Sequence, residues 1–159
     1  MNTQEPELFR SIRERLEAFS KNELGVWAIQ YSRDKLVSLA EEAVSVGRSK
    51  WEERDVNHGD LFGSVAVFKE ALFYLETVFP KPECAAAARS GLDAAVAEMD
   101  RRYRDQRFLA DRAITLEDWE SARRELAVLL EMIPDRNDDR HREAASRMLD
   151  VERRVKGGK

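Results

Sequence analysis

Two stretches of sequence decide the fold: VAVFKEALFYLETVFP at residues 65–80 and WESARRELAVLLEMIP at residues 119–134. In each stretch apolar residues recur every three or four positions, and each closes on a proline, Pro80 or Pro134. This spacing lays an apolar stripe along one face of a helix. Proline ends a helix because it has no amide hydrogen to donate and restricts the residue before it. The stretches lie 54 positions apart, which indicates two copies of one helical unit.

The two stripes share register but few identities. The alternative is that two amphipathic helices of similar length have the same spacing without being copies. In both interpretations the stripe residues form the core. They are Val65, Phe68, Leu72, Leu75 and Phe79 in the first stretch, and Trp119, Ala122, Leu126, Leu129 and Ile133 in the second.

The composition favours a single all-α domain spanning residues 1–159. Charged residues make up 36% and apolar residues 43% of the chain, with only 7 glycines and 4 prolines, as in long amphipathic helices. The 31 acidic and 27 basic residues are mixed along the chain, so no basic half is available to bind nucleic acid. No stretch approaches the roughly 20 apolar residues of a membrane span.

The cellular compartment is indicated by the cysteine and by the start of the chain. Cys84 is the only cysteine, which excludes an intramolecular disulfide and gives no sign of an oxidising compartment. The first residues, MNTQEP, are polar and acidic, unlike a secretory signal. We therefore expect a cytoplasmic protein.

The pattern predicts about six antiparallel helices. An N-terminal helix lies within residues 1–21, a first helix pair within 22–80, a second pair within 81–134 and a C-terminal capping helix within 135–156. We expect helices over about 22–55, 61–79, 82–114, 118–133 and 138–155, with Thr115 and Asp118 capping the fifth. The small residues early in the fourth helix, Gly91 among them, permit close backbone approach. The second helix is expected to bury Leu24, Trp27, Tyr31, Leu39, Ala43 and Val46.

The second pair resembles a tetratricopeptide repeat. Leu109-Ala110 matches the leucine and small residue of that repeat's first helix, while Ala122, Leu126, Leu129 and Pro134 fall at the spacings of its second. The first pair departs further, because Phe68 stands where the small alanine belongs, and both pairs exceed the usual period of about 34 residues. The resemblance, which covers roughly residues 22–155, implies a right-handed stack of helix pairs with a concave groove for a peptide or partner protein, and no cofactor.

The resemblance makes a non-catalytic interaction module or adaptor the expected function. The candidate groove residues come from the second and fourth helices. Tryptophans there can equally be core residues, and the arginines can be a solvated face paired with neighbouring aspartates. The candidates are Trp27, Tyr31, Trp51, Arg101, Arg104 and Arg107.

Two alternative functions remain open. Arg136 and His141 fit the R-N-x-x-x-H signature that resembles dimeric HEPN ribonuclease domains, in which arginine and histidine act on an RNA phosphodiester. The other alternative is a structural homo-oligomer or homodimer, because the third helix is apolar on more than one side.

The chain has few of the residues that form metal or catalytic sites. It has two histidines and one cysteine, too few for a typical zinc site or a nucleophile with its base. Residues 135–139 begin like a calcium loop, but Arg140 replaces the turn glycine and Ser146 the bidentate glutamate. We expect no metal, no cofactor and no catalytic residue.

Overall fold

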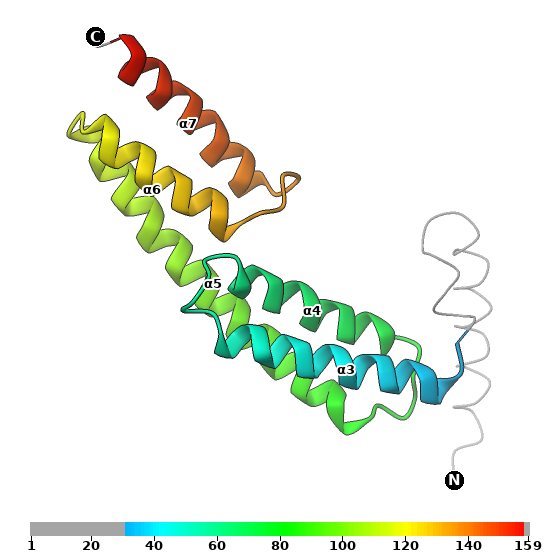
Figure 1. Ribbon diagram of the computed structural model, residues 1–159. Helices are drawn as coiled ribbons and strands as arrows, with labels where there is room; N and C mark the ends of the chain where they lie inside the picture. Colours follow the sequence, from blue (N-terminus) through cyan, green and yellow to red (C-terminus); the bar gives the residue numbers. More distant parts are fainter. Residues whose placement is uncertain (1–30, 158–159) are drawn as a thin grey trace.

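The computed structural model describes residues 31–157, and this part of the chain is all-α. Five helices follow one another, with no strand among the described residues (Figure 1). The helix predicted within residues 1–21 and the predicted start of the second helix at Asn22 lie outside the described residues. The five helices are α3 (Arg33–Glu52), α4 (Asp60–Tyr74), α5 (Glu83–Thr115), α6 (Trp119–Met132) and α7 (Asp139–Gly157).

The long helix α5 is the axis of the arrangement. Its 33 residues span about 50 Å at 1.5 Å per residue. The antiparallel helices α3 and α4, called here the α3–α4 hairpin, pack along its N-terminal half (Figure 1). Helices α6 and α7, the α6–α7 hairpin, follow along its C-terminal half. The two hairpins therefore meet near the middle of α5.

The stripes predicted from the sequence form the core in both hairpins. Val65, Phe68 and Leu75 of the first stripe are buried, as are Ala122, Leu126, Leu129 and Ile133 of the second. Leu72 and Trp119 are partly buried and pack against this core. Phe79 is 39% exposed because α4 ends at Tyr74, five residues before the predicted end. The Lys81 ammonium lies at this helix end, where it donates hydrogen bonds to the carbonyl oxygens of Leu75 and Glu76. The Leu75 carbonyl also accepts from the Val78 amide at 3.2 Å, so a side chain and a final turn together satisfy the end of the helix.

The prediction for the second helix was wrong in part: Tyr31 and Ser32 are not helical, and Tyr31 and Val46 are exposed, whereas Ala43 is buried as predicted. The helix α3 begins at Arg33, because the Ser32 hydroxyl accepts a hydrogen bond from the Lys35 amide at 3.3 Å and caps it. Its buried positions are Leu36, Ala40, Ala43, Val44 and Gly47, whereas Val46 is exposed. Small residues face α4 here, since the two helices approach closely around a large side chain of α4.

That large side chain is Phe68, whose ring is enclosed by two glycines. A Cβ atom built on Gly47 of α3 would lie 2.9 Å from the ring, and one built on Gly91 of α5 would lie 2.5 Å from it. Nearby, the buried Ser64 hydroxyl donates a hydrogen bond to the Gly47 carbonyl at 2.9 Å. Gly91 was expected to permit close approach of a neighbouring backbone, and instead it leaves room for the side-chain ring of Phe68. This space explains how the chain accommodates a phenylalanine where a small residue was expected.

The turn between α5 and α6 corrects the predicted cap at Thr115. Thr115 belongs to the last turn of α5, and its hydroxyl donates to the Asp111 carbonyl at 2.9 Å. The cap of α6 is Asp118, whose carboxylate accepts from the Ser121 amide at 3.1 Å. Between them Glu117 has a φ of 55°, and the amides of Glu117 and Asp118 bond back to Ile114 and Ala113. This is the paired hydrogen bonding of a Schellman motif, whose left-handed position usually holds glycine.

Replacing Glu117 with glycine is therefore expected to stabilise the protein by up to about 1 kcal/mol, because glycine adopts a positive φ without steric cost. Urea unfolding followed by circular dichroism measures the change. The matched control is Ala97→Gly, at an exposed position inside α5, which should lose about 1 kcal/mol. A loss of stability with Glu117→Gly would contradict the left-handed geometry.

Candidate partner-binding cleft

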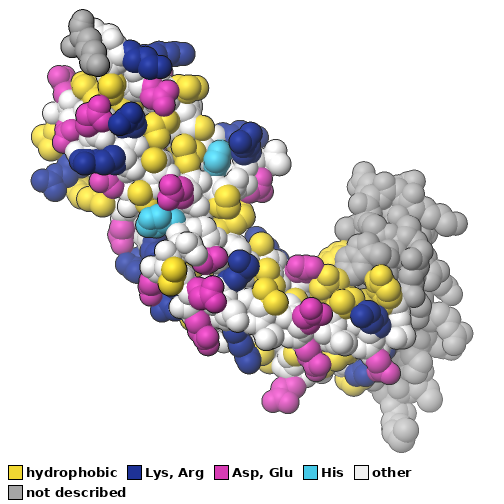
Figure 2. Space-filling model, viewed as in Figure 1, with side chains coloured by type: hydrophobic (Ala, Val, Ile, Leu, Met, Phe, Trp, Pro, Cys, Tyr) yellow, Lys and Arg dark blue, Asp and Glu magenta, His cyan; other side chains and the backbone are white. Residues whose placement is uncertain are grey.

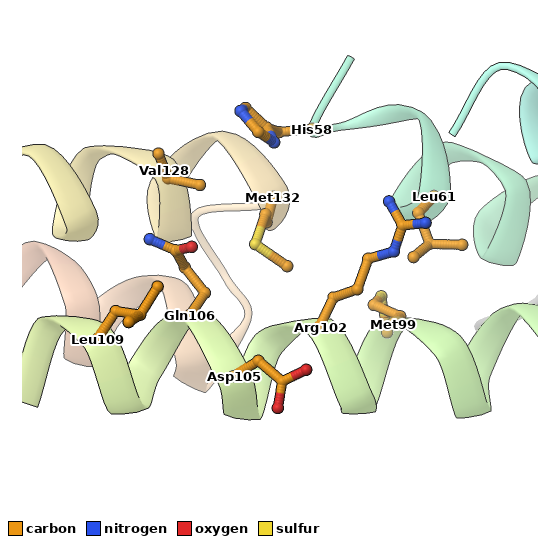
Figure 3. A pocket seen from close by; sticks show the side chains of 9 residues that line it. All are labelled: His58, Leu61, Met99, Arg102, Asp105, Gln106, Leu109, Val128 and Met132. Carbon is orange, nitrogen blue, oxygen red and sulfur yellow. The ribbon is translucent and has the colours of Figure 1, made fainter. Parts of the chain in front are cut away.

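A cleft of about 260 Å³ opens where the two hairpins meet over α5. Its lining comes from the loop before α4 and from α4, α5 and α6 (Figure 3). Five of the nine lining residues are apolar and four are polar. They are Leu61, Met99, Leu109, Val128 and Met132, with His58, Arg102, Asp105 and Gln106.

The helix α5 presents one face to the cleft. Its residues Met99, Arg102, Gln106 and Leu109 are spaced by three or four positions, which places them on the same side of a helix. Met99 is buried, but Leu109 is 44% exposed. This face lies between the hairpins, so neither hairpin covers it completely. The cleft therefore forms because both hairpins pack against the same helix.

Arg102 is held rigidly on the side of the α3–α4 hairpin. Its guanidinium bonds to the Asp55 carboxylate at 2.6 Å, to the Arg54 carbonyl at 3.1 Å and to the Glu98 carboxylate at 2.6 Å. Hydrogen bonds from Arg101 and Arg102 lower the pKa of Glu98 from 4.5 to about 2. These contacts join α5 to the segment after α3 and fix one wall of the cleft.

Gln106 fixes the opposite wall, and His58 lies at the cleft without such restraint. The Gln106 amide nitrogen donates to the Glu125 carboxylate at 2.7 Å and to the Glu125 carbonyl at 3.1 Å, which ties α5 to α6. The His58 side chain is exposed and makes no hydrogen bond or ion pair within residues 31–157. The cleft thus combines two fixed walls, an apolar lining and one polar side chain that is not engaged by the described part of the chain.

The candidate groove residues from the sequence do not line this cleft. Trp27 lies outside the described residues, and Tyr31 lies before α3 with 43% of its surface exposed. Trp51 packs partly against the core, and the Arg54 guanidinium lies over its ring at 4.3 Å. Trp51 also lines a separate groove of about 270 Å³ between α3 and α5, with a cation on the face of its ring.

The three candidate arginines of α5 all have partners. Arg101 forms ion pairs with Glu98 at 2.8 Å and Asp105 at 3.0 Å. Arg104 donates to the Asp100 carbonyl at 3.2 Å. Arg107 pairs with Glu143 of α7 at 2.8 Å and lies 3.8 Å from Asp111.

Helix α7 is tied to α5 by a series of such pairs. Besides Arg107 with Glu143, Asp100 pairs with Arg140 at 3.3 Å, and Asp111 pairs with Arg147. These pairs connect α7 to α5, while α7 packs mainly against α6. In the view of Figure 2, basic and acidic side chains are interspersed and no large area of a single sign is visible.

The residues of the RNA-cleaving alternative lie at the connection from α6 to α7. The Nδ1 atom of His141 lies 2.6 Å from the Ile133 carbonyl oxygen at the end of α6. Arg136 is exposed in the connecting loop. Asp138 accepts a hydrogen bond from the Arg140 amide at 2.9 Å, as a residue at a helix start does. Across the described part of the chain, no group of three or more histidine, cysteine or acidic side chains is placed to hold a metal ion.

The cleft residues Arg102, Gln106 and Leu109 were missed as site residues. The available signal is the spacing of Met99, Arg102, Gln106 and Leu109, a face of α5 that mixes apolar and polar residues. The sequence shows that this face exists. It does not show which two elements flank it.

The pairing of Glu98 leads to a prediction about acid stability. Because the pKa of Glu98 lies near 2 in the folded protein, below its ordinary 4.5, its stabilisation is present above pH 4.5 and is lost as the pH falls toward 2. Glu98→Gln should therefore lower the urea midpoint at pH 7 and lower it less at pH 2.5. Glu52→Gln, on the exposed end of α3, is the control and should change little at either pH. Equal effects of Glu98→Gln at both pH values would contradict the ion-paired state.

Comparison with known proteins leaves the cleft as the main guide to function. No protein-family model, curated protein or solved structure matches the chain. Among residues 31–157, no helix combines the length and apolar character needed to cross a bilayer.

Proposed function

We propose that this protein is a non-catalytic interaction module, a tetratricopeptide-like stack of helix pairs that receives an apolar side chain of a partner peptide in the cleft between its hairpins. The observation that carries the proposal is the cleft itself, where Leu109 is 44% exposed beside Val128 and Met132. Binding is favoured when a partner covers apolar side chains in a concave site, because their apolar surface is removed from water.

The size of the cleft favours an anchoring side chain over a whole small molecule. Pockets for small ligands usually measure about 300–1,000 Å³, and this one measures about 260 Å³. Protein interfaces are commonly built around one or a few side chains that fill such pockets. A partner peptide that inserts one large apolar residue would match both the volume and the lining.

The lining residues suit this role in two ways. Met99 and Met132 have flexible, polarisable side chains that adapt to the shape of an inserted group. Arg102 and Gln106 are held by their own hydrogen bonds, so the walls lose little conformational entropy when a partner binds.

The test is a random-peptide selection on the immobilised protein, followed by titration of the selected peptides. Leu109→Arg should weaken their binding by at least about tenfold, since it places a charge in the apolar lining. The matched control is Leu149→Arg on α7, another exposed leucine outside the cleft, which should leave binding within about twofold. Failure to select any peptide, or equal binding by both variants, would refute the proposal.

A further inference from the structure

A second groove lies at the opposite end of the α3–α4 hairpin, between the C-terminal part of α4, the turn that follows it and the first turns of α5. Its volume is about 570 Å³. Leu72 and Leu75 line it from α4 and the turn, and Ala85 and Ala86 line it from α5. We call it the basic groove because of the charges at its edge.

Three cationic side chains border this groove against one carboxylate. They are Lys69, Lys81 and Arg89, with Glu76 as the acid. All four are exposed. Lys69 and Arg89 form no ion pair within residues 31–157, in contrast to the arginines in the middle of α5. This groove therefore carries an excess of positive charge, although the chain as a whole has a net charge of −4. Such an excess attracts an anionic partner.

Lys81 is fixed in its position by the turn. Its ammonium donates to the Leu75 and Glu76 carbonyls and lies 4.1 Å from the centre of the Phe79 ring. Partial burial lowers the pKa of Lys81, and the charge of Arg89 lowers it further, while the nearby Glu76 carboxylate acts in the opposite direction without restoring the ordinary value. An anion beside Lys81 would relieve this unfavourable charge. The N-terminal end of α5, at Glu83, adds the positive end of a long helix to the same region.

From this arrangement we propose that the basic groove binds an acidic peptide segment of a partner protein, in which a leucine or phenylalanine lies among aspartates and glutamates. The apolar side chain lies against Leu72, in the space left by Ala85 and Ala86. The carboxylates pair with Lys69, Lys81 and Arg89. This surface is separate from the cleft, so the proposal does not depend on the function assigned to the cleft.

The apolar lining favours a peptide over a nucleic acid or a free anion. Leucine and alanine side chains bind aliphatic or aromatic groups, whereas a phosphate backbone needs only the cations. Surfaces that bind single-stranded nucleic acid usually supply aromatic platforms for the bases. This groove has one aromatic side chain in its lining, Phe73, and its other apolar lining residues are leucine and alanine, so it lacks a row of rings on which successive bases could stack.

The probe is a fluorescein-labelled peptide, DEDLFDEL, whose binding to the full chain is measured by fluorescence anisotropy. Binding should weaken at least about tenfold in the double variant Lys69→Glu with Arg89→Glu. It should also weaken steeply between about 50 mM and about 500 mM NaCl, as expected for exposed charges. Arg136→Glu, an exposed arginine on the far hairpin, should stay within about twofold of the wild type. Circular dichroism melting verifies that each variant is folded.

Two further peptides distinguish the contribution of the apolar residues from that of the acidic residues. DEDSSDES keeps the acids but lacks the apolar residues and should bind at least about fivefold more weakly; KRKLFKRL should not bind. Leu109→Arg in the cleft should leave DEDLFDEL binding unchanged, so failure of the cleft and failure of the basic groove are distinguishable. Three results would overturn the proposal: equal affinity for DEDLFDEL and DEDSSDES, unchanged binding by the double variant, or displacement of the labelled peptide by polyadenylate RNA but not by unlabelled DEDLFDEL.

Discussion

Replacing Phe68 with alanine is expected to destabilise the protein by about 3–5 kcal/mol, the upper range for large-to-small core changes. The ring is 2% exposed and lies between helices α3 and α5. Gly47 and Gly91 have no side chains that could move into the vacated space. The cavity would therefore persist rather than collapse, and its cost would add to the lost burial of the ring. Urea denaturation followed by circular dichroism measures the change.

The matched control is Phe108→Ala on α5, where the ring is 65% exposed. It should change stability by no more than about 0.5 kcal/mol, as surface substitutions usually do. A loss of less than about 1 kcal/mol for Phe68→Ala would show that the ring is not the centre of this packing.

The second large effect concerns Gly91, where alanine should reverse its usual influence. In most helices a change from glycine to alanine stabilises by up to about 1 kcal/mol. Here the new Cβ would lie 2.5 Å from the Phe68 ring, so we expect a net loss of about 1–3 kcal/mol. In the Phe68→Ala background the ring is absent, and the same substitution should become stabilising.

Gly63→Ala in α4 is the control for this reversal. A Cβ there would meet the Lys50 side chain at 3.0 Å, and a flexible lysine can move aside. This variant should be neutral or stabilising in both backgrounds. If Gly91→Ala has the same sign with and without the Phe68 ring, the two residues are not coupled and the proposed enclosure is wrong.

The helices and their core faces were largely predictable because burial follows the helical period. Leu126 and Leu129 are buried where the stripe placed them. For α3 the prediction was wrong in placing the large residue Val46 in the core instead of the small residue beside it. Close packing around Phe68 instead selects Gly47, and this requirement arises on another helix.

The end of α5 and the cleft show two further limits of sequence reasoning. Thr115 can either cap the following helix or bond to its own preceding turn, and its local sequence allows both. The left-handed backbone at Glu117 favours the bond from Thr115 to its own preceding turn.

The cleft depends on elements that are distant in the chain, His58 before α4 and Val128 on α6. Their proximity follows from the path of α5, which no local pattern records.

The continuity of α5 also restricts how the chain can change in length. One residue inserted near Arg104 would turn the α6–α7 hairpin by about 100° around the helix axis relative to the α3–α4 hairpin and shift it by about 1.5 Å. That rotation would separate Met99 from Met132 and dismantle the cleft. Seven inserted residues would nearly restore the phase, with a residual turn of about 20°, but would move the hairpins about 10 Å apart. The middle of α5 should therefore tolerate substitutions far better than insertions or deletions.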